Sequence, residues 1–175
     1  MKLKTTILRA IDRVKKYAGC IAEGLELDKK TTDNIQLACQ LHDLGKIHIS
    51  QEILNKPGKL SDKEWGEIKL HPAKSAEILK PLAFLKKAAI LVEQHHEYFD
   101  GNGYPAGLRG GEIDLGARII SVADSFDAMT TERFYAKALD KESSIKELER
   151  CKGSQFDPEV VDIFVKLLKT QPELF

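Results

Sequence analysis

The sequence places a histidine, an aspartate and a lysine close together in the stretch Leu41-His42-Asp43-Leu44-Gly45-Lys46. This stretch ends an apolar helical pattern, where burying an unpaired carboxylate costs several kcal/mol. Gly45 supplies the backbone freedom that ends a helix, and Lys46 adds a positive charge. A neutral imidazole, a carboxylate and an ammonium at one helix end fit a metal that acts on an anionic substrate. A hydrogen-bonded His–Asp contact without a metal is the commoner explanation of such a pair, so other residues must decide.

Four of the 5 histidines fall at the ends or junctions of expected helices: His42, His71, His95 and His96. His71 precedes Pro72, a residue that suits the first turn of a helix. Neighbours on a helix point about 100° apart, so His95 and His96 converge on one centre only where the helix ends. The alternative is a packed histidine beside an exposed one. His48 is interpreted as a surface residue or an outer neighbour of the site.

Asp124 interrupts an apolar run that should be buried, and Asp127 follows one turn later on the same expected face. Pairing of Asp124 with Arg118 or with an internal hydroxyl is the alternative to a metal-binding role. Together with the four histidines and Asp43, Asp124 completes a mixed nitrogen and oxygen set. Such a set suits iron, manganese or another first-row ion, whereas a structural zinc site would use thiolates.

The elements that must position these residues are all helices, because apolar residues recur every three or four positions and no alternating strand pattern appears. We expect Asp28 to begin the second helix, and capping boxes to begin two others at Ser61–Glu64 and Ser144–Glu147. The glycine-rich stretch 99–111 is expected to be a functional loop. The sequence predicts one all-α domain over residues 1–175, with helices near 7–25, 28–41, 61–70, 72–79, 84–95, 115–129 and 157–168, a further helix that begins at Ser144, and a short helical turn within 47–54.

The composition excludes several classes of protein. Lys plus Arg and Asp plus Glu both number 27, which argues against a partner that is a nucleic-acid polymer. Cys20, Cys39 and Cys151 are few and far apart, which fits thiols in a reducing compartment. No apolar run approaches the roughly 20 residues that span a bilayer, and no signal peptide is apparent. We therefore expect a cytoplasmic protein without membrane insertion.

The motifs together resemble the HD-GYP domain, a subgroup of the HD-superfamily metal-dependent phosphohydrolases, from about Ile11 to Phe164. This resemblance implies a single-domain helical bundle with a metal centre in its core. It also implies a phosphodiesterase that hydrolyses cyclic di-GMP to pGpG or GMP. The matching stretches are Leu41–Lys46, His71-Pro72, His95-His96-Glu97, Asp100–Pro105, Arg118–Asp124, Asp127–Thr130 and Phe156-Asp157-Pro158.

The resemblance also implies roles for single residues. Two divalent ions, iron or manganese, would be held by His42, Asp43, His71, His95, His96 and Asp124, with Asp43 bridging them. A hydroxide between the ions would attack the phosphodiester, and Lys46 would neutralise charge on the phosphate. The substrate cyclic di-GMP would contact Lys46, Gly103, Tyr104, Pro105, Asp127 and Arg133, although Arg133 read alone is nearly as well explained as a solvated surface residue. The Gly103-Tyr104-Pro105 loop would also offer a surface to GGDEF-domain proteins.

The chain departs from the family pattern at several positions. Ala10 stands where the family usually has a histidine ligand, and Thr6 where trinuclear members have a glutamate. Ala136 replaces a common basic residue, and Ser75 a frequent glycine. An enzyme is favoured, because the other expected ligands and Lys46 are present. The alternatives are a degenerate module that binds cyclic di-GMP or docks GGDEF domains without turnover, and an HD-type phosphohydrolase for another nucleotide.

Overall fold

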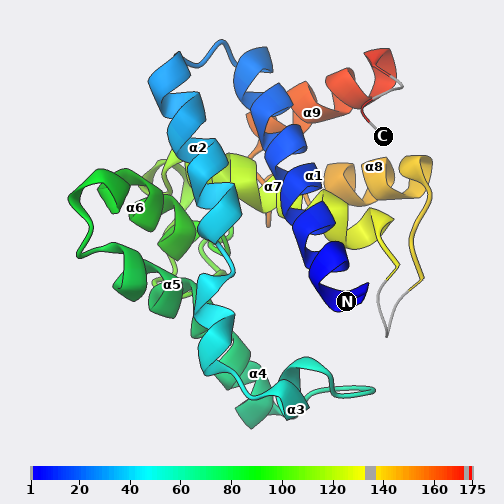
Figure 1. Cartoon of the computed structure of the whole chain (residues 1–175). Coiled ribbons are helices and arrows are strands. Elements are labelled where there is room, and N and C mark those ends of the chain that lie inside the picture. The colour runs from blue at the N-terminus through cyan, green and yellow to red at the C-terminus, as the bar shows by residue number, and fades with distance from the viewer. Residues whose placement is uncertain (1, 133–136, 172–173, 175) are drawn as a thin grey trace.

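The computed structural model describes residues 2–132, 137–171 and 174, and within them the chain is helical (Figure 1). The long helices expected from the sequence are present, with boundaries close to those predicted. A bridge between Lys152 and Phe156 is isolated, and the described residues form no strand. The helices are α1 (Lys2–Gly24), α2 (Lys29–Leu41), α3 (Gln51–Leu54), α4 (Asp62–Ile68), α5 (His71–Leu79), α6 (Lys86–Gln94), α7 (Leu115–Thr130), α8 (Lys141–Arg150) and α9 (Pro158–Thr170), with shorter 3-10 turns η1 (Leu44–His48), η2 (Ala83–Leu85) and η3 (Gly110–Glu112).

Helix starts follow the side chains that accept from free backbone amides. Asp28 accepts from the Thr31 amide, and Ser61 and Glu64 form the expected capping box. The second predicted capping box is wrong: α8 begins earlier, with Asp140 accepting from the Ser143 amide. Ser144 lies inside the helix instead, and its hydroxyl donates to the Asp140 carbonyl at 2.9 Å.

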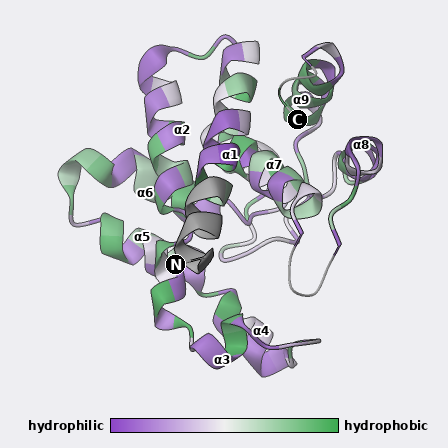
Figure 2. Ribbon diagram, turned by 45° about the vertical axis from the view of Figure 1, so that its right-hand side comes forward, coloured by the Kyte–Doolittle hydropathy of each residue, from purple (hydrophilic) through white to green (hydrophobic). Residues whose placement is uncertain are grey.

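The core lies between α1 and α7, with α2, α6, α8 and α9 around them. Tyr17 of α1 packs edge-on against Phe126 of α7, with ring centroids 5.2 Å apart, and Phe164 of α9 completes the aromatic cluster. Figure 2 shows hydrophobic and hydrophilic residues alternating along the helices, as expected where one face is buried. Among the described residues, no helix combines the length and apolar character needed to cross a bilayer.

Residues 44–70, which contain η1, α3 and α4, project from one end of the bundle as a side lobe (Figure 1). The core cluster takes in Leu44 at the edge of this lobe and otherwise consists of residues outside it. An ion pair between Lys56 and Glu64, 2.7 Å long, ties the lobe together internally. The lobe is therefore a local structure standing beside the bundle, and it forms one wall of the site described next.

Candidate metal centre

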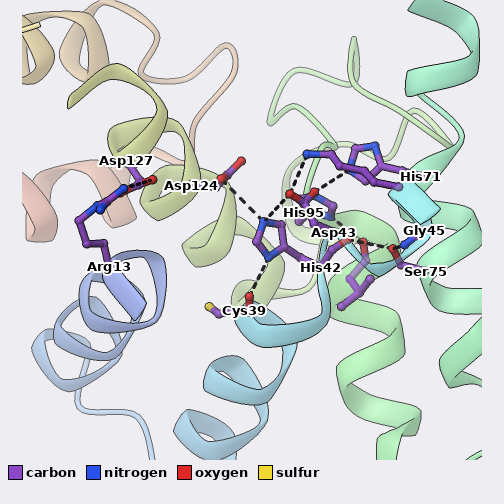
Figure 3. A network of polar contacts seen from close by, with 12 residues as sticks. Arg13, Cys39, His42, Asp43, Gly45, His71, Ser75, His95, Asp124 and Asp127 are labelled. Atoms are coloured by element: carbon purple, nitrogen blue, oxygen red, sulfur yellow. Dashed lines mark hydrogen bonds and ion pairs between the residues drawn. The ribbon is translucent and has the colours of Figure 1, made fainter. Parts of the chain in front are cut away.

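Three helix ends and the middle of a fourth helix meet at one point. His42 caps the C-terminus of α2, His95 caps that of α6, and His71 opens α5. Asp124 lies within α7 and points toward His42 (Figure 3). The structure thus brings together the histidines and carboxylates that the sequence singled out, and it shows why they lie at helix ends: these ends converge.

Each of three imidazoles is oriented by a carbonyl three residues earlier in the chain. The Nδ1 atoms of His42 and His71 lie 2.7 Å from the carbonyls of Cys39 and Ile68, and Nδ1 of His95 lies 2.6 Å from that of Val92. Carbonyls in the last turn of a helix lack intrahelical partners, so they accept from these rings. Because a carbonyl can only accept, Nδ1 must carry the proton, which leaves Nε2 as an unprotonated donor for a metal.

Burial favours the neutral form of the His71, His95 and His96 rings. Burial lowers the pKa of His71 and holds that of His95 well below its usual range. Burial lowers the pKa of His96 to about 4. Neutral imidazole is the form that coordinates metals, so near neutral pH these rings are ready to bind without first losing a proton.

The distances among these atoms fit a shared ion. The candidate ligand atoms of His71, His95 and His96 all lie within 4.8 Å of one another. Nitrogens sharing one ion through bonds of about 2.1 Å lie about 3–4 Å apart, so only a small contraction is needed. Nε2 of His71 and of His95 are buried without a hydrogen-bond partner. Since buried polar atoms are nearly always paired, these two nitrogens mark the position that a cation would occupy.

Asp43 links this cluster to a second group of ligands. Its Oδ1 lies 3.4 Å from Nε2 of His71, and its Oδ2 lies 3.7 Å from Nε2 of His42. That same nitrogen of His42 lies 3.8 Å from Oδ1 of Asp124. Burial alone would raise the pKa of Asp43, but His42 and Lys46 outweigh it and hold the pKa below its ordinary range. Lys46 donates to Oδ2 of Asp43 at 2.7 Å.

Asp127 is placed differently from what the sequence suggested. Its side chain is 2% exposed and its carboxylate is turned to Arg13 of α1, 2.5 Å from Nε (Figure 3). The same guanidinium donates to Thr131 at 2.8 Å. This pair between a half-buried arginine and a buried carboxylate ties α1 to α7, so we do not assign Asp127 to the substrate.

The pairing of Asp124 with Arg118 that the sequence left open does not occur. The Arg118 guanidinium pairs with the Asp157 carboxylate and donates to the Ile113 carbonyl at 3.0 Å. His48 is exposed. Arg133, the expected phosphate contact, and Ala136 lie outside the described residues. Burial raises the pKa of the Cys39 thiol to about 12, which disfavours it as a ligand.

Ser75 has a structural role that sequence reasoning did not assign. Its hydroxyl donates to the His42 carbonyl at 2.9 Å and accepts from the Gly45 amide at 2.7 Å. The chain comes so close here that a Cβ on Gly45 would lie 2.2 Å from the His71 carbonyl oxygen. Only glycine fits, and this contact sets the separation of Asp43 from His71.

Glu97 was also missed. It is 2% exposed, and its carboxylate accepts from the amides of Ala106 at 2.6 Å and Leu108 at 3.0 Å. These bonds fix the Gly103-Tyr104-Pro105 loop over the histidines. A Cβ on Gly103 would lie 2.1 Å from the Tyr98 amide nitrogen, and the Tyr104 ring stacks on His96 with centroids 5.0 Å apart. Glu97 directly follows the predicted ligands His95 and His96, and this position was the signal from which the sequence could have indicated its role.

Replacing Glu97 with alanine is expected to lower the free energy of unfolding by about 1–3 kcal/mol, because the backbone amides of Ala106 and Leu108 lose a buried, charged acceptor. Proteolysis of the 98–109 loop should become faster. Glu93→Ala is the control: Glu93 lies near the end of α6, one turn before Glu97 in the chain, and its exposed ion pair with Lys80 should contribute at most about 1 kcal/mol. Urea unfolding and limited proteolysis measure both effects. Equal losses in the two variants would show that Glu97 does not hold the loop.

A cavity of about 390 Å³ opens between this centre and the side lobe. Asp43, His71, His96 and Asp124 line one end, and Lys46 reaches into it from η1. The side lobe lines the cavity with Ile53, Leu54, Lys56, Gly58, Leu60, Trp65 and Ile68, and Tyr104, stacked on His96, completes the lining. The arrangement is a polar metal-binding end joined to an apolar, aromatic end that carries a lysine.

A helical bundle with histidines and aspartates gathered at converging helix ends can be compared with known protein families. A family model described as HD domain matches residues 3–160. The chain belongs to the HD-domain family.

Named relatives are phosphodiesterases of cyclic dinucleotides. The chain is 39% identical, over 89% of its length and 42% of the relative's, to the cyclic di-GMP phosphodiesterase response regulator RpfG of Xanthomonas campestris pv. campestris. It is 38% identical, over 93% of its length and 35% of the relative's, to the 3'3'-cGAMP-specific phosphodiesterase 3 of Vibrio cholerae. The chain thus spans less than half the length of these relatives. The structure of Bd1817, an HDG"Y"P protein from Bdellovibrio bacteriovorus, has the same fold, with a TM-score of 0.74, 24% identity and coverage of 91% of this chain and 51% of that one.

Proposed function

We propose that this domain is a metal-dependent phosphodiesterase that hydrolyses cyclic di-GMP. The observation that carries the proposal is the pair of buried Nε2 atoms on His71 and His95 that make no hydrogen bond, with the Asp43 carboxylate 3.4 Å from the first of them at the end of an open cavity. The relatives that act on cyclic di-GMP and on cGAMP support the substrate class, and both compounds are cyclic dinucleotides.

The residues divide into two ligand groups in this proposal. His71, His95 and His96 hold one divalent ion, His42 and Asp124 hold the other, and Asp43 serves both. Iron or manganese suits this mixture of imidazole and carboxylate. Two such ions supply Lewis acidity toward a phosphoryl oxygen and toward the attacking water.

The chain's own groups position the substrate. Lys46 lies at the mouth of the metal end, with its ammonium on Asp43, so it can donate to a phosphate oxygen entering there. The Tyr104 ring, fixed against His96, limits how the diester can approach. Asp43 holds its negative charge, since its low pKa keeps it ionised throughout the range in which the histidines are neutral.

The test is metal content per chain after anaerobic purification, measured beside turnover of cyclic di-GMP and 3'3'-cGAMP. We expect bound iron or manganese and hydrolysis of cyclic di-GMP to pGpG or GMP. A protein that holds metal, binds cyclic di-GMP and leaves it intact would instead be a degenerate module. We consider this second candidate because Ala10 occupies the position at which the family usually has a histidine that binds metal.

Replacing Ala10 with histidine is expected to raise occupancy of the ion held by His42 and Asp124. Ala10 is half-buried on α1, one turn before Arg13, which contacts α7. A missing imidazole plausibly costs a few kcal/mol of metal affinity, so that ion should be the weaker one in the natural chain. Metal titration should show two unequal affinities that become closer in the variant, with a matching rise in turnover.

Ala18→His, on the same helix but in the apolar core, controls for a histidine that merely adds a metal-binding group. If Ala10→His fills the weaker site while hydrolysis stays undetectable, the binding module takes precedence over the enzyme. If it changes neither metal content nor turnover, Ala10 does not face the centre.

A further inference from the structure

The apolar end of the cavity carries an aromatic wall that the metal chemistry does not use. Trp65 of α4 lines the cavity and is 44% exposed, although it is the chain's only tryptophan. A tryptophan that served packing alone would be expected in the core, yet this one stands on the side lobe. Its exposed ring is therefore available to contact a ligand in the cavity.

Lys69 connects Trp65 to the metal end. Its ammonium lies 5.8 Å from the Trp65 ring centroid and 5.5 Å from that of Tyr104. Both distances fall within the range of a cation–π contact. Tyr104 in turn stacks on His96, so Lys69 links the Trp65 ring to a ring that lies on a candidate metal ligand, and both rings line the same cavity. We call Trp65, Lys69 and Tyr104 the aromatic wall.

We propose that the aromatic wall binds a guanine base of the substrate, with the base stacked on Trp65 and Lys69 donating to its O6 and N7 atoms. This inference rests on the proposed function, since it places a phosphate of the same nucleotide at the metal end. Bases stack on aromatic side chains whatever their identity, so Trp65 supplies affinity. Guanine offers acceptors at both O6 and N7, whereas adenine has an amino donor in place of O6. The ammonium of Lys69 therefore selects guanine over adenine.

Binding is tested first without turnover, in protein stripped of metal with a chelator. Because Trp65 is the sole tryptophan, its fluorescence reports directly on a stacked base. GMP is expected to quench it at concentrations several-fold lower than AMP. Lys69→Ala should bring the two nucleotides to the same affinity. Lys63→Ala, which removes an exposed lysine of α4, leaves the Lys69 contacts with Trp65 and Tyr104 in place and should preserve the difference.

Turnover supplies the second test. Trp65→Leu should lower kcat/KM for cyclic di-GMP on the order of tenfold more than for methyl p-nitrophenyl phosphate, a diester without a nucleobase. Lys69→Ala should lower the preference for cyclic di-GMP over cyclic di-AMP several-fold. If Trp65→Leu fails to fold, Lys69→Ala still decides, since it retains the fluorescent ring.

The outcomes separate the two proposals. Equal quenching by GMP and AMP in the natural protein, or equal losses of kcat/KM on both diesters in Trp65→Leu, would overturn guanine binding by the aromatic wall. The proposed phosphodiesterase activity would not be affected by either result. Absence of metal and of turnover on every diester would overturn the phosphodiesterase, and selective quenching by GMP would then still support the wall.

Discussion

Asp43→Ala is expected to empty the metal centre and to reduce hydrolysis of cyclic di-GMP by at least about a hundredfold, since Lewis acidity there contributes several kcal/mol. The Asp43 carboxylate lies against both His42 and His71, so its loss should weaken both ligand groups at once. When both proteins are heated in the presence of metal, the Asp43→Ala variant should unfold at a lower temperature than the natural protein, because metal binding stabilises the folded state.

Metal analysis, calorimetry and turnover of the two forms measure this prediction. Asp33→Ala is the matched control: it removes an exposed carboxylate of α2 whose partner is Lys29, and it should change none of the three quantities appreciably. Full metal content in Asp43→Ala would show that Asp43 does not bridge the ligand groups.

Gly45→Ala is expected to lower the free energy of unfolding by about 3 kcal/mol or more. The added Cβ would lie 2.2 Å from the His71 carbonyl oxygen and 2.7 Å from the Ser75 amide nitrogen. Both are backbone atoms, so the helix start at His71 must move away from Asp43. Metal affinity should fall together with stability.

Gly66→Ala provides the opposite case. A Cβ on Gly66 in α4 meets no atom within 4 Å, so this change should stabilise the helix by about 0.5–1 kcal/mol. Urea unfolding with metal analysis compares the two variants. Similar stability in both would mean that the close approach at Gly45 is not required.

The sequence predicts the local features well because their causes are local. Asp28 and Ser61 cap their helices as expected, since a cap depends only on residues within one turn. Ser144 has the spacing of a capping box, but Asp140 begins the helix earlier and makes Ser144 an interior residue. Asp140 and Ser144 are both residue types that cap helices, and spacing alone does not show which of them begins this helix.

The sequence predicted the site residues that lie at helix ends. It did not predict those whose role depends on contacts with parts of the chain that are brought near only by the fold. His42, His71 and His95 were visible because each lies at a helix boundary. Glu97 acts on amides of Ala106 and Leu108, whose approach depends on the fold of the loop. Asp127 shares a helix with Asp124, but Arg13, far away in sequence, determines where its carboxylate points.

The carbonyl contacts of the three imidazoles have a consequence for the choice of metal. Each ring is oriented through its Nδ1 atom by a carbonyl three residues earlier, on Cys39, Ile68 or Val92. Because these contacts lie within the chain, we expect the ring orientations to be the same whichever ion is bound. Ligands held in advance add little ordering entropy when an ion arrives. They also impose the same geometry on iron, manganese or cobalt. We therefore expect the backbone to discriminate little among these ions, so that the ion the domain binds would depend on which one is available to it.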